Sequence, residues 1–366
     1  MPEEHQIALE TLILAFNEIP DRIESAAQIA FLRGQAHESL MRLQSKLVCE
    51  QSFKPRAVRL EAAKFKTVER IEGKFDLVLL LPERQRDQTL SDIARGFDLL
   101  NEGGTLMVCL HNDWGAKRFE KHVEELAGNV TMLAKHHCRV FWATKTADLK
   151  EETLAEWRTF GGLRRVLDGQ FWSQPGLFSW NEVDGGSAML AAHLPAELKG
   201  HGADFGAGWG YLSHQVLNKC HDVAAMDLYE ADRHALEAAK RNLGLLPVPC
   251  RPHYLWSDVP NDAPIGRYDF IVMNPPFHDG REPDHLLGIK FIAAAARALK
   301  SDGELWMVAN RHLPYEHLLE EAFGEKSLIA QDGSFKVLHA SSPRQSMVPV
   351  RSRERKGKWP GKRRGK

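Results

Sequence analysis

The sequence contains, at residues 203–212, the stretch Ala203-Asp204-Phe205-Gly206-Ala207-Gly208-Trp209-Gly210-Tyr211-Leu212, in which a short strand passes through three glycines into a helix. Glycine lets a backbone turn tightly and approach a ligand without a Cβ clash. Ligands of open α/β sheets bind at such turns, beyond the carboxyl ends of the strands. The third glycine comes one residue too early for the dinucleotide pattern GxGxxG. On its own, the stretch leaves a cofactor loop and a packing turn equally open.

An acid, Asp204, stands at the head of this glycine turn. A loop headed by an acid favours a ligand with a cationic ammonium group, whereas a pyrophosphate needs an unobstructed helix N-terminus. S-adenosylmethionine carries an ammonium group and also a carboxylate that backbone N–H groups can bind. We therefore predict that Asp204, Gly206, Gly208 and Gly210 bind this cofactor.

A second acid closes the next predicted strand, residues 222–226, and lies 21 residues after Gly206. We predict that this residue, Asp227, accepts hydrogen bonds from both ribose hydroxyls and that Leu228 packs on the adenine. Enzymes that bind NAD use an acid in the same way, so Asp227 does not distinguish the two cofactors. After the third predicted strand, Asp258 is placed to accept a hydrogen bond from the adenine amine, with a surface-loop acid as the alternative.

The apolar strand at residues 268–273 runs into Asn274-Pro275-Pro276-Phe277. Proline fixes φ and lacks an N–H, and the residue before a proline is extended. The result is a stiff turn that presents a side-chain amide, bare carbonyls and an aromatic ring. Such a turn is typical of methyltransferases that act on planar exocyclic amines, and a proline turn after a buried strand is the alternative.

The pattern of strand, helix, glycine turn and strand occurs twice in the chain, since Asp76 corresponds to Asp269 and Gly104 to Gly303. We therefore predict an α/β protein with two tandem Rossmann-like domains of the class I methyltransferase type, at residues 1–150 and 165–342.

The first domain is predicted to be degenerate and to serve as a scaffold or to hold RNA. Leu80-Leu81-Pro82-Glu83 replaces the Asn-Pro-Pro-Phe turn, and residues 48–65 contain no glycine. Residues 1–70 are predicted to be mainly helical, with one helix at residues 21–33. Asp184 and Ser187, which precede a predicted helix at residues 188–194, are interpreted either as caps of that helix or as site residues.

The composition, 43% hydrophobic and 27% charged over 366 residues, is that of an ordinary soluble protein. We find no apolar run of membrane-spanning length and no signal-peptide pattern at the N-terminus, so we expect a cytoplasmic protein that does not bind a membrane. The five cysteines are scattered and never spaced as CxxC, so we expect reduced thiols and no metal site.

The net charge of −1 hides a strongly basic C-terminus. Residues 344–366 hold ten lysines and arginines and one acid, a net charge of +9, which leaves −10 for the rest. A segment of this composition is predicted to be disordered, and its charge suits an RNA phosphate backbone. A solubilising tail without a specific partner is the alternative.

Several motifs together resemble the bacterial 16S rRNA guanine-N2 methyltransferases of the small ribosomal subunit, and the resemblance covers residues 170–340. They are Pro175-Gly176-Leu177-Phe178-Ser179, the glycine turn, Asn274-Pro275-Pro276-Phe277-His278-Asp279-Gly280, Gly303-Glu304-Leu305-Trp306-Met307-Val308-Ala309-Asn310 with Leu313-Pro314-Tyr315, and Phe335-Lys336-Val337. The resemblance implies methylation of a guanosine N2 amine that depends on S-adenosylmethionine, with 16S rRNA or the 30S subunit as partner. We expect the enzyme to be a monomer. The basic tail departs from the family's usual ending.

The hypothetical mechanism assigns three catalytic residues. The Asn274 side-chain oxygen and the Pro275 carbonyl accept hydrogen bonds from the amine, and Phe277 stacks on the base with about 1–3 kcal/mol. A guanosine in folded RNA must first be flipped out. His278 and Asp279 are interpreted as residues that shape the loop, with a general base as the alternative. A 23S rRNA enzyme, a protein glutamine methyltransferase and an RNA-holding pseudo-enzyme remain alternatives, whereas the glycine spacing disfavours a dehydrogenase.

Overall fold

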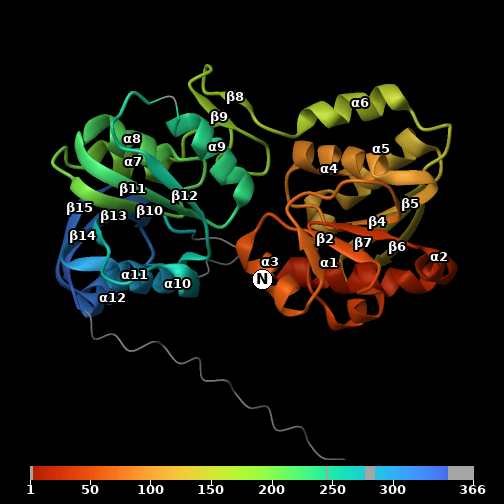
Figure 1. The fold of residues 1–366 in the computed structure, drawn as a ribbon, viewed down its shortest axis with the longest axis horizontal. Helices are drawn as coiled ribbons and strands as arrows, with labels where there is room; N and C mark the ends of the chain where they lie inside the picture. Colours follow the sequence, from red (N-terminus) through yellow and green to blue (C-terminus); the bar gives the residue numbers. More distant parts are fainter. Residues whose placement is uncertain (1–2, 245, 277–284, 345–366) are drawn as a thin grey trace, which may run out of the picture.

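The computed structural model describes residues 3–244, 246–276 and 285–344. Within these residues the chain forms two seven-stranded sheets that lie side by side, each with helices on both faces (Figure 1). The strand order is β3-β2-β1-β4-β5-β7-β6 in the first sheet and β12-β11-β10-β13-β14-β16-β15 in the second. Because the two orders are the same, strand for strand, the predicted pair of tandem Rossmann-like methyltransferase domains is confirmed.

The first half contains seven strands, of which β7 runs antiparallel to both its neighbours. They are β1 (Ile29–Leu32), β2 (Leu47–Glu50), β3 (Lys66–Val68), β4 (Phe75–Leu80), β5 (Leu100–His111), β6 (Thr131–Lys135) and β7 (Cys138–Thr144). The α-helices are α1 (Glu3–Leu14), α2 (Pro20–Ser25), α3 (Lys54–Ala62), α4 (Arg86–Asp98), α5 (Ala116–Ala127) and α6 (Glu151–Phe160).

The second half repeats the arrangement after a short hairpin of β8 (Arg164–Val166) and β9 (Phe171–Ser173). Its sheet strands are β10 (Lys199–Phe205), β11 (Asp222–Glu230), β12 (Pro252–Trp256), β13 (Tyr268–Met273), β14 (Leu299–Asn310), β15 (Phe323–Gln331) and β16 (Phe335–Pro343). Its helices are α7 (Gly185–His193), α8 (Tyr211–Lys219), α9 (Arg233–Leu243), α10 (Val259–Asp262), α11 (His285–Ala298) and α12 (Tyr315–Ala322). Among the described helices, none has the length and apolar character needed to cross a membrane.

The predicted correspondence of Asp76 and Asp269 has a structural basis. Asp76 Oδ2 accepts hydrogen bonds from the backbone N–H groups of Ala27 and Gln28, at 2.9 and 3.3 Å, just before β1. Asp269 Oδ2 accepts one from the His201 N–H in β10, at 2.7 Å. In both halves, the acid therefore ties the first strand of the sheet to the fourth.

The predicted helix at residues 21–33 is wrong in its second half. Helix α2 ends at Ser25, and Ile29–Leu32 form the central strand β1, whose side chains are all buried. A parallel strand that is buried on both faces is a continuous apolar run, which periodicity does not separate from a short buried helix. As a consequence, the turn that corresponds to the glycine turn follows β1 at residues 33–37, not at 48–65, and it contains one glycine, Gly34.

Helix α6 belongs with the first half, although the predicted boundary at residue 150 leaves it outside. Its side chains Leu154 and Trp157 are buried in the same apolar core as α4 and β4. The β8–β9 hairpin that follows packs instead on the second half, where Val166 and Phe171 contact Trp209 and α9. The chain thus passes from one half to the other at residues 161–163.

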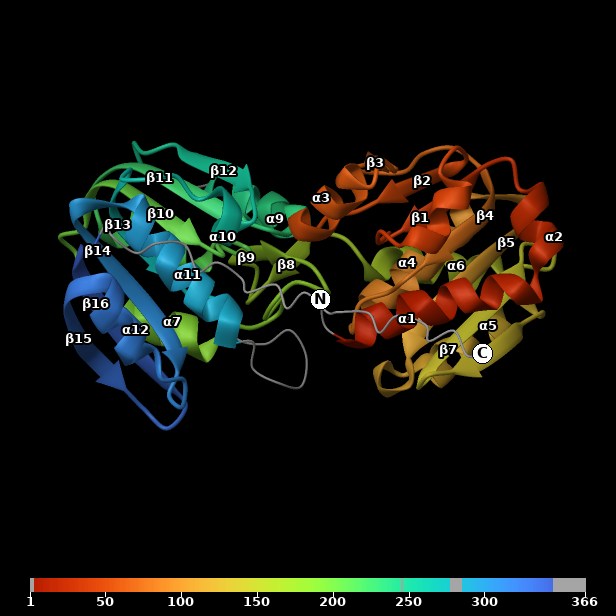
Figure 2. The same ribbon diagram turned by 90° about the horizontal axis from the view of Figure 1, so that it is seen from below.

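The two halves meet through corresponding turns, residues 52–54 and 231–233, which we call the junction (Figure 2). The Lys54 N–H donates to the Ala231 carbonyl at 2.8 Å, and the Arg233 N–H donates to the Ser52 carbonyl at 3.1 Å. Lys54 and Arg233 are the first residues of α3 and α9, the helices that follow the second strand of each sheet. The contact is therefore reciprocal, as in an interface between two copies of one domain.

Candidate active site

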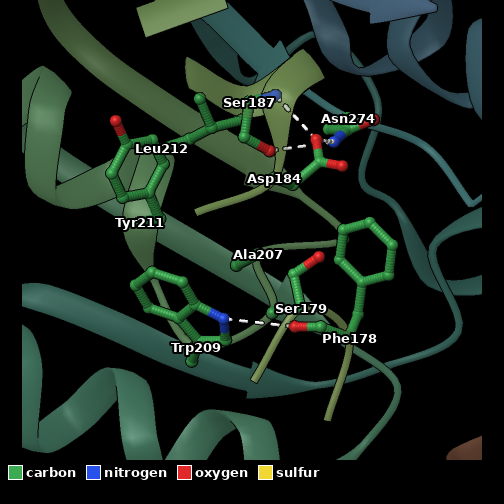
Figure 3. Close-up of a pocket in the computed structure, with 11 residues that line it drawn as sticks. Phe178, Ser179, Asp184, Ser187, Ala207, Trp209, Tyr211, Leu212 and Asn274 are labelled. Carbon is green, nitrogen blue, oxygen red and sulfur yellow. Dashed lines mark hydrogen bonds between the residues drawn. The ribbon is translucent and has the colours of Figure 1, made fainter. Parts of the chain in front are cut away.

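A pocket lies at the carboxyl edge of the second sheet (Figure 3). Its wall is formed by the glycine turn at residues 206–212, by Phe178 and Ser179, by Asp184 and Ser187 at the start of α7, and by Asn274 after β13. Segments nearly a hundred residues apart in the chain thus converge at the edge where open α/β sheets bind ligands.

The glycine turn leaves its backbone accessible from the pocket. Gly208 has φ +55°, and no heavy atom lies within 4 Å of the place a Cβ would occupy. Gly210 has φ +87°, and its Cβ would lie 3.1 Å from the Cβ of Ala239 in α9. Gly206 and Gly208 therefore line the pocket, whereas Gly210 allows α8 and α9 to approach each other.

Asp204 lies beneath the turn and does not line the pocket. It is fully buried, and its Oδ2 accepts hydrogen bonds from the Ser213 hydroxyl at 2.7 Å and from the Ser213 N–H at 3.1 Å. Burial raises the pKa of Asp204 to about 7. In this position the carboxylate anchors the first turn of α8 below the glycines, behind the wall of the pocket.

Asp227 and Leu228 lie inside the sheet, because β11 does not end at Asp227 but continues to Glu230. Asp227 is 1% exposed; its Oδ2 accepts a hydrogen bond from the Tyr268 hydroxyl at 2.8 Å, and His253 Nδ1 lies 2.9 Å from its Oδ1. Leu228 points into the apolar core on the other face. The predicted strand end was wrong because β11 carries acids at both Asp227 and Glu230, and Asp227 was taken as the residue that ends the strand.

Glu230 is the acid at the strand end. Its Oε2 accepts the Gly208 N–H and its Oε1 accepts the Asp232 N–H, both at 2.8 Å. Burial raises the pKa of Glu230 to about 7, although these two N–H groups act in the opposite direction. Asp232 caps α9 by accepting the His234 N–H at 3.0 Å. The acid that comes last before this cap is Glu230, and its position in front of the cap was the sequence signal for the end of the strand.

Asp258 follows β12, as predicted, and is the residue before α10. Its Oδ2 accepts a hydrogen bond from Asn261 Nδ2 at 2.6 Å, within its own turn. It lies at the carboxyl edge of the sheet but is not part of the wall of the pocket.

Asn274 is held in one orientation by two residues at the start of α7. Its Nδ2 donates to Asp184 Oδ2 and to Ser187 Oγ, both at 2.8 Å. A carboxylate can only accept hydrogen bonds, so the amide nitrogen must face Asp184 and the amide oxygen must face away from it. Asp184 also accepts the Ser187 N–H at 2.7 Å, which confirms that it caps α7.

Of the other predicted catalytic residues, Pro275 is buried directly after Asn274, and Phe277 lies outside the described residues, as do His278 and Asp279. In the part of the chain that the structure describes, no group of three or more His, Cys, Asp or Glu side chains is arranged to hold a metal ion. All five cysteines are buried and free of disulfides.

The corresponding edge of the first sheet is occupied by ion pairs. Leu81 takes the place of Asn274, and Glu83 two residues later lies 2.5 Å from Arg56 and 2.9 Å from His5. Although burial opposes it, the Arg56 guanidinium together with His5 holds the pKa of Glu83 well below its usual range. Arg33, the first residue after β1, pairs with Asp92 at 2.6 Å.

Comparisons with known proteins agree with this geometry. The family described as "Methyltransferase small domain" matches residues 168–339. A "Ribosomal RNA small subunit methyltransferase C" of Psychromonas ingrahamii is 31% identical over 271 residues, which are 73% of this chain and 76% of the relative. The protein of the same name from Citrobacter koseri is 28% identical and covers 90% of this chain and 91% of its own.

Among solved structures, the 16S rRNA N2 G1207 methyltransferase (RsmC) of T. thermophilus, in complex with AdoMet and guanosine, superposes with a TM-score of 0.72. It is 24% identical and covers 86% of this chain and 88% of its own, so it supports the fold. The fold and the pocket define a class I methyltransferase that depends on S-adenosylmethionine. This chain belongs to the ribosomal RNA small subunit methyltransferase C family.

Proposed function

We propose that this enzyme methylates the exocyclic N2 amine of a guanosine in 16S rRNA of the small ribosomal subunit. The observation that carries the proposal is the fixed amide of Asn274, whose nitrogen is held by Asp184 and Ser187 so that its oxygen is available to an amine donor. The relatives named above, which share most of the chain, carry the name of a small-subunit rRNA methyltransferase and support the choice of substrate.

The residues at this edge fit S-adenosylmethionine, which supplies an activated methyl group when it is bound. The open space beside the Gly208 backbone accommodates its methionine part. Glu230, not Asp227, is the acid we assign to the ribose hydroxyls. Each carboxylate has about four lone-pair positions, and Glu230 uses two of them for the Gly208 and Asp232 N–H groups.

Asn274 Oδ1 and the Pro275 carbonyl would accept the two protons of the guanine amine. The lone pair of this nitrogen is delocalised into the ring, so two acceptors that draw it toward tetrahedral geometry make it a better nucleophile. Positioning of this kind supplies most of the catalysis, and water can take the proton released after transfer. Phe277 remains our candidate for stacking on the flipped base, as the sequence predicts.

We also propose roles for the rest of the chain. The first half serves as a non-catalytic scaffold that holds RNA, because ion pairs of Glu83 and Arg33 fill the edge where the second half has its pocket. Residues 344–366 contact RNA phosphates through their net charge of +9. The enzyme acts as a monomer in the cytoplasm, where rRNA is assembled into subunits.

The test is transfer of radiolabelled methyl groups to 16S rRNA, 30S subunits, 23S rRNA and a release-factor-like protein in parallel, followed by nucleoside analysis. We expect N2-methylguanosine in 16S rRNA or 30S subunits only. Asn274→Ala should lower kcat by roughly 100-fold or more, the scale seen when one preorganised hydrogen-bonding group is removed.

In the same variant, the affinity for S-adenosylmethionine, measured by calorimetry, should stay within about threefold, since the amide is assigned to the amine and not to the cofactor. Asn218→Ala, an exposed asparagine of α8 outside the pocket, is the matched control and should behave as the native enzyme. Label found only in 23S rRNA or in protein, or full turnover by Asn274→Ala, would reject the proposal.

A further inference from the structure

Beside the pocket, two arginines from different elements stack on one tryptophan. The guanidinium carbon of Arg165 in β8 lies 4.8 Å from the ring centre of Trp172 in β9, and that of Arg241 in α9 lies 4.7 Å from the same centre. A cation over an indole ring is attracted by the ring quadrupole. We call Arg165, Trp172 and Arg241 the Arg–Trp stack.

The charges of the stack are not neutralised within the described part of the protein. Both arginines are exposed, and neither has a carboxylate within ion-pair distance among the described residues; the hydrogen bond of Arg165 goes to the Gly169 carbonyl at 2.8 Å. Lys240, which precedes Arg241, is paired with Glu237 at 2.5 Å and so differs from its neighbour. Two unpaired cations fixed on one ring repel each other, and an anion that bridges them removes this cost.

Arg164, the neighbour of Arg165, extends this basic surface. It donates to backbone carbonyls, among them that of Phe160, and its guanidinium carbon lies 5.6 Å from the ring centre of Trp180. It too has no carboxylate partner among the described side chains. Arg164 and Arg165 of β8 therefore lie against Trp180 and Trp172, and such arginine–tryptophan pairs suit both the phosphates and the bases of a nucleic acid.

The stack is connected to the pocket by a short chain of hydrogen bonds. The backbone N–H of Trp172 donates to Asn242 Oδ1 at 2.6 Å. Asn242 Nδ2 in turn donates to the backbone carbonyls of Trp172 and Trp209, at 2.9 and 2.7 Å. Trp209 lines the pocket and donates through Nε1 to the carbonyl of Phe178 at 3.2 Å (Figure 3). Phe178, at the pocket, is 69% exposed. The stack is thus anchored to the pocket wall through one buried asparagine.

The position of the hairpin also fits an extended ligand. The β8–β9 hairpin stands next to α9 and between the two halves of the molecule in both views (Figures 1 and 2). A strand whose nucleotide enters the pocket must continue across the adjoining surface. On the side of Trp209 and Asn242, that surface is the Arg–Trp stack.

We propose that the Arg–Trp stack binds the RNA backbone next to the target nucleotide, with Arg165 and Arg241 contacting phosphates and Trp172 holding both guanidinium groups in place. The inference rests on the proposed function, because it takes the substrate to be RNA. It adds which surface receives the strand and which side chains contribute the charge.

The test compares Arg165→Gln/Arg241→Gln with a control pair of equal charge change, Lys199→Gln/Arg251→Gln, two exposed basic residues at the amino ends of β10 and β12, opposite the pocket edge of the second sheet. In the stack variant, KM for 30S subunits or 16S rRNA should rise at least about tenfold, and the slope of log KM against log salt should become shallower by about two. The value of kcat at saturating RNA and the affinity for S-adenosylmethionine should not change.

Trp172→Leu keeps every charge and removes the ring, so a rise in KM for this variant separates stacking from bulk charge. RNA affinity is also measured directly, by fluorescence anisotropy with a labelled 16S rRNA fragment, which needs no methyl transfer. If the native protein labels another substrate but its RNA affinity depends on the stack, the proposed function fails and the stack stands. Unchanged RNA affinity in both stack variants, or equal losses in the stack and control pairs, overturns the inference.

Discussion

Asn274 can act on an amine only if its amide oxygen faces the substrate, and one carboxylate enforces this orientation. Asp184 accepts hydrogen bonds both from Asn274 Nδ2 and from the Ser187 N–H, at 2.8 and 2.7 Å. The first contact fixes the amide, and the second caps α7. The cap requires only an acceptor oxygen, whereas the orientation of Asn274 requires a group that cannot donate. A substitution of equal size can therefore separate the cap from the orientation.

We expect Asp184→Asn to keep the cap and lose the orientation. Asparagine caps helices as well as aspartate does, so the melting temperature should change little. Its amide, however, can donate to Asn274, which permits the amide of Asn274 to turn, and kcat should fall by roughly 10- to 100-fold, as for other residues that orient a catalytic group. Stopped-flow or steady-state methyl transfer measures kcat, and unaltered kcat with a normal melting curve would contradict the role.

Glu230 predicts a pH dependence of cofactor binding. The ionised carboxylate can accept from both ribose hydroxyls, and its pKa is raised to about 7 by burial, with the Asp232 carboxylate acting in the same direction. The affinity for S-adenosylmethionine should therefore weaken roughly tenfold between pH 8 and pH 6 as the carboxylate gains a proton. Glu230→Gln should bind weakly without this profile, as calorimetry at several pH values can show.

The control for this profile is Asp204→Asn, because burial raises the pKa of Asp204 to about 7 as well, but its carboxylate bonds Ser213 away from the pocket. It should leave the pH dependence of binding intact. In the absence of cofactor, between about pH 4 and pH 7, both carboxyl groups still hold a proton in the folded protein, whereas they have already lost it in the unfolded chain. Stability should therefore fall as pH rises from about 4 to 7 and level off above this range.

Sequence reasoning found some of these residues and missed others for a physical reason. Asn274, Gly206 and Gly208 belong to local motifs, and the structure brings all three to one pocket. Glu230 was missed because it depends on the end of a strand, and strand ends are not encoded by short patterns as clearly as strands are. The contact of Asp184 with Asn274 joins positions 90 residues apart, so no local spacing could reveal it.

At the scale of elements, the glycine turn lines the pocket and also lets α8 pack closely against α9. Gly210 has φ +87°, and a Cβ there would lie 3.1 Å from the Cβ of Ala239. Gly128, after α5, has φ +70° but no heavy atom within 4 Å of a Cβ position. Gly210 and Gly128 both have a left-handed backbone. The difference in unfolding free energy between their alanine variants therefore measures the cost of forcing α8 away from α9.

We expect Gly128→Ala to cost about 1–2 kcal/mol, the strain of a left-handed residue with a Cβ. Gly210→Ala should cost about 1–3 kcal/mol more, since overpacking adds to that strain. Urea unfolding monitored by circular dichroism gives both values. Equal losses in the two variants would show that α8 and α9 yield without cost at this contact.

Some strands could be recognised from sequence patterns, and others could not be distinguished from helices. The strands β4 and β13, with the acids and glycines around them, were recognisable as a repeat because long buried runs and their turns recur in order. Strand β1 was assigned to a helix, because four buried residues carry no alternation. Of the two signals that predicted a degenerate first half, the segment 48–65 was the wrong one, whereas residues 80–83 do stand where the second half has Asn-Pro-Pro-Phe. The ion pairs of Arg33 and Glu83 now supply the structural reason.

At the scale of the molecule, the junction connects the first half to the part of the second half that we assign to the cofactor. The carbonyl of Ala231, which directly follows Glu230, accepts hydrogen bonds from the Lys54 N–H and from Trp256 Nε1, both at 2.8 Å. Trp256 Nε1 also lies 2.7 Å from the Ser52 carbonyl, so one indole bridges the two halves. The first half thereby supports the turn that positions Glu230.

We expect Trp256→Phe to weaken S-adenosylmethionine binding although the residue is outside the pocket. Loss of this shared hydrogen bond should cost about 0.5–1.5 kcal/mol, which corresponds to roughly threefold to tenfold in Kd if the turn must be ordered for binding. Hydrogen exchange should increase at residues 52–54 and 231–233 together. Trp306→Phe is the matched control, since Trp306 Nε1 donates to Glu304 within the second sheet at 2.9 Å and touches no residue of the junction. The expectation fails if Trp256→Phe and Trp306→Phe bind S-adenosylmethionine with the same affinity, or if hydrogen exchange rises on one side of the junction alone. In that case the first half does not influence the cofactor site of the second half.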